Sequence, residues 1–150
     1  MRPVVQLLGV PCVQRAGIAS PAIRGHKAWG LMAYLALHPG AVSRQRLAGL
    51  LFEEAGDPLA ALRWNLRELR RALGESTLRG DPVSFPHAQV TEVDVAVLAR
   101  GRWPEALSLP GLGLDLLEGL GFSASPSFEA WLQSERRRMQ ATSEDRKSVV

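Results

Sequence analysis

The sequence predicts an α+β fold, and three observations carry this prediction. Short β-prone runs separated by Gly and Pro occupy the first 24 residues, three segments with helical spacing follow over residues 26–73, and a turn-rich stretch with further β-prone residues comes next. Hydrophobic residues make up 46% of the 150 residues. This is enough apolar surface to build a packed core in a chain of this length.

The N-terminal stretch is predicted to form a small antiparallel meander. Residues 4–8 and 10–13 are β-prone runs broken by Gly9 and Pro11, and another short run ends at Ile23. Apolar runs bounded by Gly and Pro are typical of strands joined by tight turns.

Two helices are predicted after the meander. Residues 26–38 place apolar side chains at helical spacing and stop at Pro39 and Gly40. A second, shorter helix is predicted to begin after Ser43, because a serine hydroxyl can accept a hydrogen bond from the free amides of a helix N-terminus.

The third helix is predicted over about residues 58–73. Asp57 is suited to the N-cap, Pro58 to the first helical position, and Gly74 to ending the helix. Leucines recur along it at spacings of three and four residues, which predicts one face packed into the core. These leucines are Leu59, Leu62, Leu66, Leu69 and Leu73.

Strand-like residues return after the third helix. A hairpin is predicted over about residues 77–86, with a turn at Gly80, Asp81 and Pro82. Residues 90–95 then add one more strand or the start of a helix.

The composition changes beyond Asp94. Residues 98–120 are rich in Leu and Gly and predict short helical pieces broken at Pro104 and Pro110. A last helix is predicted to open at Pro126, with a polar tail after Gln140 that is expected to fray. We therefore expect one domain over residues 1–93 and a short C-terminal helical segment over residues 94–150.

A strand meander, three helices and a hairpin form the order of a winged helix-turn-helix. In such folds the third helix enters the major groove of DNA and the hairpin, or wing, touches the neighbouring backbone. The order of elements thus predicts contact with double-stranded DNA.

The distribution of charge supports an anionic partner. The net charge is +3, but the first fifty residues carry six basic side chains and no acidic one. The net charge of residues 51–100 is −2, and that of the last fifty residues is −1. Such an asymmetry indicates a partner that carries phosphates or other anions.

Several other classes of protein are disfavoured. The chain has neither the apolar region of a signal peptide nor an apolar run long enough to cross a membrane, so we expect a cytoplasmic protein. Cys12 is the single cysteine, and the histidines show no metal-ligand spacing, so we expect no metal and no cofactor. Gly111 and Gly113 fail the G-x-G-x-x-G pattern because residue 116 is Leu. We therefore expect no enzymatic activity.

The predicted outward face of the third helix suits the edges of DNA bases. Arginine can pair with guanine, asparagine with adenine, and an aromatic edge can meet a thymine methyl group. The candidate DNA-binding residues on this helix are Arg63, Trp64, Asn65, Arg67, Arg70 and Arg71. The alternatives are a merely solvated arginine face and, for Trp64, packing against the wing.

Three further residues are candidates for contact with the DNA backbone. Ser43 and Arg44 open the second helix, whose free amides favour a phosphate, although Ser43 also suits ordinary capping. Arg79 lies on the predicted wing.

Taken with their order and spacing, several segments resemble a known family. The segments are residues 26–36, 42–47 and 62–74, followed by residues 116–119 and 125–136. The first three are similar to the OmpR-like winged helix of SARP-type bacterial transcriptional activators. The last two are similar to the opening of the bacterial transcriptional activation domain of that family.

The resemblance implies binding to promoter half-sites by two protomers and recruitment of RNA polymerase. It also implies a polymerase contact in the connection between the second and third helices, at Glu53 and Glu54. The chain departs from the family at Phe52, where Trp is frequent, and in ending about one helix after Trp131, where the family continues as a helical array. Either a fragment of a longer regulator or a natural short form fits this pattern.

A function of another class also remains open. The short activation-like segment and the aromatic residues fit a protein-interaction module that modulates another regulator or RNA polymerase without binding DNA.

Overall fold

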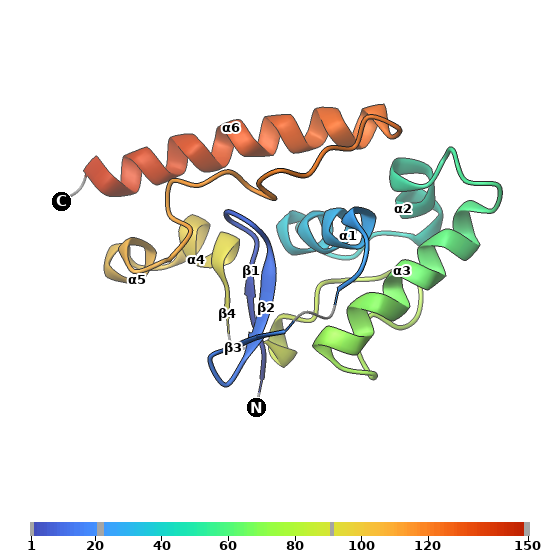
Figure 1. The fold of residues 1–150 in the computed structure, drawn as a ribbon, viewed down its shortest axis with the longest axis horizontal. Coiled ribbons are helices and arrows are strands. Elements are labelled where there is room, and N and C mark those ends of the chain that lie inside the picture. The colour runs from blue at the N-terminus through green and yellow to red at the C-terminus, as the bar shows by residue number, and fades with distance from the viewer. Residues whose placement is uncertain (1, 21–22, 91, 149–150) are drawn as a thin grey trace.

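A four-stranded sheet lies beside the helices in the computed structural model, which describes residues 2–20, 23–90 and 92–148 (Figure 1). Its strands, in the order β3-β2-β1-β4, are β3 (Ile18–Ser20), β2 (Cys12–Arg15), β1 (Val4–Gln6) and β4 (Glu92–Val93). The antiparallel pairing of β1 with β2 and of β2 with β3 confirms the meander. Strand β4 pairs in parallel with β1 and brings the second half of the chain into the same sheet.

The three predicted helices are confirmed: α1 (His26–Leu37), α2 (Arg44–Leu51) and α3 (Pro58–Leu73). The Ser43 hydroxyl caps α2 by accepting from the Arg46 amide at 3.1 Å. Asp57 caps α3 by accepting from the Ala60 amide at 3.1 Å. Gly74 ends α3 with a positive φ of 129°, a conformation that a residue with a Cβ rarely adopts.

The predicted core face of α3 needs one correction. Leu62, Leu66, Leu69 and Leu73 are buried, but Leu59 is 43% exposed. Leu59 lies in the first turn of α3, beside the exposed connection from α2, and does not belong to the hydrophobic core cluster.

The hairpin predicted over residues 77–86 does not form. Val83 instead forms an antiparallel bridge with Val42, and each amide donates to the other residue's carbonyl at 2.8 Å. Pro82 has no N–H to donate, and Leu78 has a φ of 58°, which is far from extended backbone. The segment therefore consists of turns that lie against the start of α2.

Residues 90–95 realise both predicted alternatives, because β4 leads directly into α4 (Asp94–Arg100). The short helix α5 (Trp103–Leu107) follows, and the chain then reaches α6 (Pro126–Ser148) through an irregular segment (Figure 1).

Helix α6 continues well past Gln140, so the predicted fraying is wrong. Met139 and Ser143 are buried under its second half. Arg146 Nε donates to the Leu98 carbonyl of α4 at 3.1 Å. These contacts with the preceding helices stabilise a segment whose composition alone is polar.

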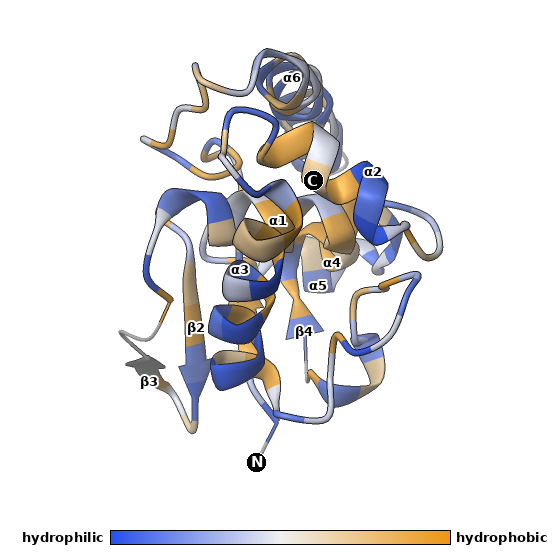
Figure 2. Cartoon of the chain, turned by 90° about the vertical axis from the view of Figure 1, so that its right-hand side faces the viewer, coloured by the Kyte–Doolittle hydropathy of each residue, from blue (hydrophilic) through white to orange (hydrophobic). Residues whose placement is uncertain are grey.

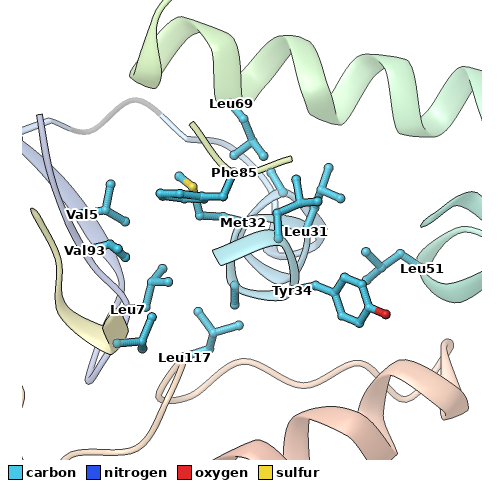
Figure 3. Close-up of a cluster of buried hydrophobic side chains, with 14 of the residues drawn as sticks. Val5, Leu7, Leu31, Met32, Tyr34, Leu51, Leu69, Phe85, Val93 and Leu117 are labelled. Atoms are coloured by element: carbon cyan, nitrogen blue, oxygen red, sulfur yellow. The ribbon is translucent and has the colours of Figure 1, made fainter. Parts of the chain in front are cut away.

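The hydrophobic core is one cluster that joins the sheet, α1 and α3 to residues beyond 94. In the close-up, Val5 of β1 and Leu7, which follows β1, lie near Val93 and Leu117 (Figure 3). Leu31 and Met32 of α1 lie on the other side. The division into residues 1–93 and 94–150 stays a prediction, since a shared core does not show how the two segments fold.

Candidate nucleic-acid interface

The outward side of α3 is polar and basic. Arg63, Arg67 and Arg71 are exposed on it, and hydrophilic residues follow one another along this helix (Figure 2). Trp64 is 44% exposed and lies outside the hydrophobic core. These side chains are accessible to a ligand that approaches α3 from solvent.

Asn65 does not share this exposed side. It is 7% exposed, and its Nδ2 donates to the Ala61 carbonyl at 2.8 Å within the helix. The expectation that Asn65 belongs to the outward face of the third helix is therefore wrong, because position 65 lies next to the leucine face. Contact between Asn65 and a base stays a prediction, and it would require the side-chain amide to leave Ala61.

Four arginines from three segments form a basic cluster, which we define as Arg44, Arg67, Arg70 and Arg79. Arg70 Nη1 donates to the Leu78 carbonyl at 3.3 Å, and Arg70 Nε is buried without a hydrogen-bond partner among the described residues. Burial lowers the pKa of Arg70, and the charges of Arg79, Arg44 and Arg67 lower it further. A bound anion would relieve this repulsion.

The N-terminus of α2 binds a carboxylate of the protein itself, that of Asp81. The Arg44 amide donates to Asp81 Oδ1 at 3.0 Å, and Arg44 Nε donates to the Gly80 carbonyl at 2.7 Å. Ser43 is engaged in capping, as described above. Two of the amides proposed for a phosphate are thus already bonded within the protein, and the Arg44 side chain is tied to residues 80–81.

Arg79 reaches the cluster even though no hairpin forms. Its Nε donates to the Glu75 carbonyl at 2.9 Å, and its Nη2 lies 3.8 Å from Glu75 Oε2. The turn over residues 75–81 therefore brings Arg79 to the side of α3 that faces α2.

A second group of charges lies around Glu68, the acidic residue within α3. Arg71 Nη1 donates to Glu68 Oε2 at 2.9 Å, and Arg24, which precedes α1, donates through Nε and Nη2 at 3.3 Å each. Burial alone would raise the pKa of Glu68, but the hydrogen bonds from Arg24 and Arg71 outweigh it and hold the pKa below its ordinary value.

Sequence reasoning missed Arg24 as part of this site. It lies outside the predicted DNA-binding helices and far from Glu68 along the chain. The available signal was Glu68 itself, since a buried carboxylate in a basic helix needs cationic partners.

The two candidate polymerase contacts lie in the connection between α2 and α3. Glu53 and Glu54 are both exposed, and Glu54 forms an ion pair with Lys27 at the start of α1. Burial lowers the pKa of Lys27, whose Nζ lies 5.4 Å from the centre of the Phe52 ring. Glu54 is thus tied to α1, and Glu53 is exposed to solvent.

Across residues 2–20, 23–90 and 92–148, no three His, Cys, Asp or Glu side chains converge as they would around a metal ion. Over that same part of the chain, no helix combines the length and the hydropathy needed to cross a membrane.

The fold is similar to that of a solved protein. EmbR from Mycobacterium tuberculosis, solved in complex with a low-affinity phosphopeptide, matches with a TM-score of 0.58 and 18% sequence identity. The match covers 94% of this chain and 43% of the EmbR chain, so this chain spans less than half of that protein. Neither a family model nor a curated protein matches the sequence. At this identity the likeness shows the fold alone.

Proposed function

We propose that this protein is a sequence-specific regulator of transcription that binds double-stranded DNA with α3 in the major groove. One observation carries the proposal: α3 exposes Arg63, Arg67 and Arg71 while its acidic residue, Glu68, is buried under arginines. A helix with its side chains is about 10–12 Å across and fits a major groove about 12 Å wide.

The position of each residue suggests its role on DNA. Arg67 lies at the middle of the outward side, where a guanidinium can pair with guanine O6 and N7. We propose that Trp64, which is 44% exposed, meets a thymine methyl group. The basic cluster flanks α3, where Arg44 and Arg79 would contact phosphates and fix the register without reading sequence.

The likeness to the EmbR fold and the resemblance to SARP-type activators support the same proposal. On that basis we propose promoter half-sites as the DNA target and a pair of protomers on the DNA. RNA polymerase would be met through Glu53 and Glu54.

A salt titration tests the proposal directly. The affinity of the full chain for duplex DNA from a genomic promoter pool should fall linearly with salt on a log-log scale, with a slope of about −0.9 per phosphate neutralised. Absence of salt-dependent binding to every duplex in the pool would refute the proposal.

Two substitutions separate base reading from backbone contact. Arg67→Ala should reduce discrimination between a selected duplex and a scrambled one by about 1–3 kcal/mol, because it removes a contact with a base edge. Arg44→Ala should weaken binding to both duplexes alike. Equal, sequence-independent losses in both variants would contradict this division of roles.

A further inference from the structure

The buried Glu68 carboxylate holds two arginines beside α3. We propose that Arg24, positioned by Glu68, contacts the DNA phosphate backbone on the side of α3 opposite the basic cluster. This inference rests on the proposed binding of α3 in the major groove. It adds a contact residue from the segment before α1 and assigns Glu68 a positioning role.

The two groups of charge lie on different sides of the same helix. Successive residues of an α-helix are rotated by about 100°, so positions 68 and 70 point about 160° apart around the axis. Arg70 belongs to the basic cluster with Arg44 and Arg79, whereas Glu68 holds Arg24 and Arg71. Arg67 lies between them on the outward side.

Two phosphate backbones border a major groove. A helix that fills the groove therefore brings each of its sides near one backbone. The basic cluster supplies cations to one side of α3. On the other side, Glu68 holds Arg24 and Arg71, and Arg15 Nη2 donates to the Ala72 carbonyl at 2.7 Å. Arg24 and Arg71 are our candidates for the second backbone, because the Glu68 carboxylate fixes the direction of their guanidinium groups.

Arg24 is both anchored and accessible. Its backbone amide, Nε and Nη2 each lie 3.3 Å from a Glu68 carboxylate oxygen, yet its side chain is 71% exposed. These bonds leave other N–H groups of the guanidinium open to solvent. An arginine held in this way loses less rotational freedom when it binds a phosphate than a free one does.

Packing alone does not explain an acid at position 68. A carboxylate that is 3% exposed is costly to bury unless cations pair with it, and an apolar side chain would fill the same space without that cost. What the carboxylate adds is a fixed direction for two guanidinium groups. The negative charge of Glu68 lies next to the proposed DNA-binding side of α3. The positive charges of Arg24 and Arg71 offset it there.

The salt dependence of binding tests Arg24, with Arg102 as a matched control. Arg102 is also an exposed arginine paired with a glutamate, Glu105 at 3.1 Å, but it lies at α5, on the far side of the molecule from α3 (Figure 1). Arg24→Ala and Arg102→Ala remove the same charge. Each variant is titrated with a mixed-sequence DNA duplex over a series of salt concentrations.

We expect Arg24→Ala to weaken binding to all duplexes and to make the log-log slope shallower by about 0.9, the value for one phosphate contact. Arg102→Ala should leave the slope unchanged. If Arg24→Ala retains the wild-type slope while the wild type binds, this inference is overturned and the proposed function stands. If the wild type binds no duplex, both are overturned.

Glu68→Gln tests the positioning role through the sign of its effect. The substitution removes a negative charge near the DNA, so a glutamate that only repels phosphates would give tighter binding. A glutamate that positions Arg24 and Arg71 gives weaker binding despite the added positive charge, which is the result we expect. Tighter binding would overturn the positioning role.

A double variant guards against an effect on folding. Arg24→Ala leaves Glu68 with one cationic partner fewer, and the loss of stability can be measured by circular dichroism. The variant that combines Arg24→Ala with Glu68→Gln removes the under-paired carboxylate. It should fold and still show the shallower slope, whereas a return to the wild-type slope would overturn the phosphate contact.

Discussion

Two buried carboxylates in this protein have pKa values shifted in opposite directions. Glu68 has two arginine partners, and its pKa is held low. Asp94 is also 3% exposed but is bound by backbone amides, accepting from Leu7 at 2.9 Å and from Leu8 at 2.8 Å. Burial raises the pKa of Asp94 to about 6 and outweighs these amides. Hydrogen bonds from two guanidinium groups thus dominate the pKa of Glu68, whereas burial dominates the pKa of Asp94.

The raised pKa of Asp94 predicts a loss of stability as pH rises. The folded protein holds this proton up to about pH 6, whereas in the unfolded chain the carboxyl has its ordinary pKa of 3.8. The free energy of unfolding of the wild type should therefore fall relative to that of the Asp94→Asn variant. The expected decrease between pH 4 and pH 6.5 is up to about 3 kcal/mol.

Urea denaturation of both proteins over this pH range measures the effect. The asparagine variant does not titrate at this position and serves as the reference. A difference in unfolding free energy that stays constant with pH would show that Asp94 has an ordinary pKa in the folded state.

At the scale of elements, the contact of α1 with the start of α6 depends on one glycine. A Cβ added at Gly30 would lie 2.8 Å from Phe122 Cε1 and 3.0 Å from Phe128 Cζ. Both rings are buried and pack edge to face, with centroids 4.7 Å apart. Gly30 thus lets α1 approach these two rings more closely than alanine would.

We expect Gly30→Ala to destabilise the protein by about 1–3 kcal/mol, because overpacking outweighs the gain in helix propensity. Gly49 in α2 is the matched control, since a Cβ there would meet nothing within 4 Å. Gly49→Ala should stabilise the protein by up to about 1 kcal/mol. Denaturant unfolding compares the two, and a stabilising Gly30→Ala would contradict the close approach.

The elements also show how far local pattern predicts this fold. Helices α2 and α3 begin where Ser43 and Asp57 predict, and α3 ends where Gly74 predicts, because caps act on amides and carbonyls within a few residues. The hairpin prediction failed because Val83 pairs with the distant Val42. The prediction that Asn65 is exposed failed because position 65 lies next to the leucine face of α3, which packs into the core.

At the scale of the whole molecule, the N-terminal and C-terminal segments share a core. The Leu117 amide donates to the Leu7 carbonyl at 2.9 Å, Ser125 Oγ donates to the Leu51 carbonyl at 3.0 Å, and Asp94 accepts from the Leu8 amide at 2.8 Å. We expect a single cooperative unfolding transition for the full chain, because neither segment can open without exposing apolar surface of the other.

Tryptophan fluorescence tests this cooperativity from both segments. Trp29 lies in α1 and Trp131 in α6, so variants that retain one or the other report on each segment separately. Their denaturation midpoints should coincide with the midpoint from circular dichroism. Separate midpoints would instead support independent domains over residues 1–93 and 94–150.

The sequence by itself determined the meander, the three helices and the basic outward side of α3, because spacing, caps and helix breakers act over a few residues. The tertiary structure alone decided which distant groups meet. Arg24 and Glu68 are 44 residues apart, and Leu7 and Asp94 are 87 residues apart. No local pattern encodes such pairs, since they depend on how the packed core orients the elements. In this protein the core brings an exposed arginine, Arg24, to a buried acid of the helix proposed to read DNA.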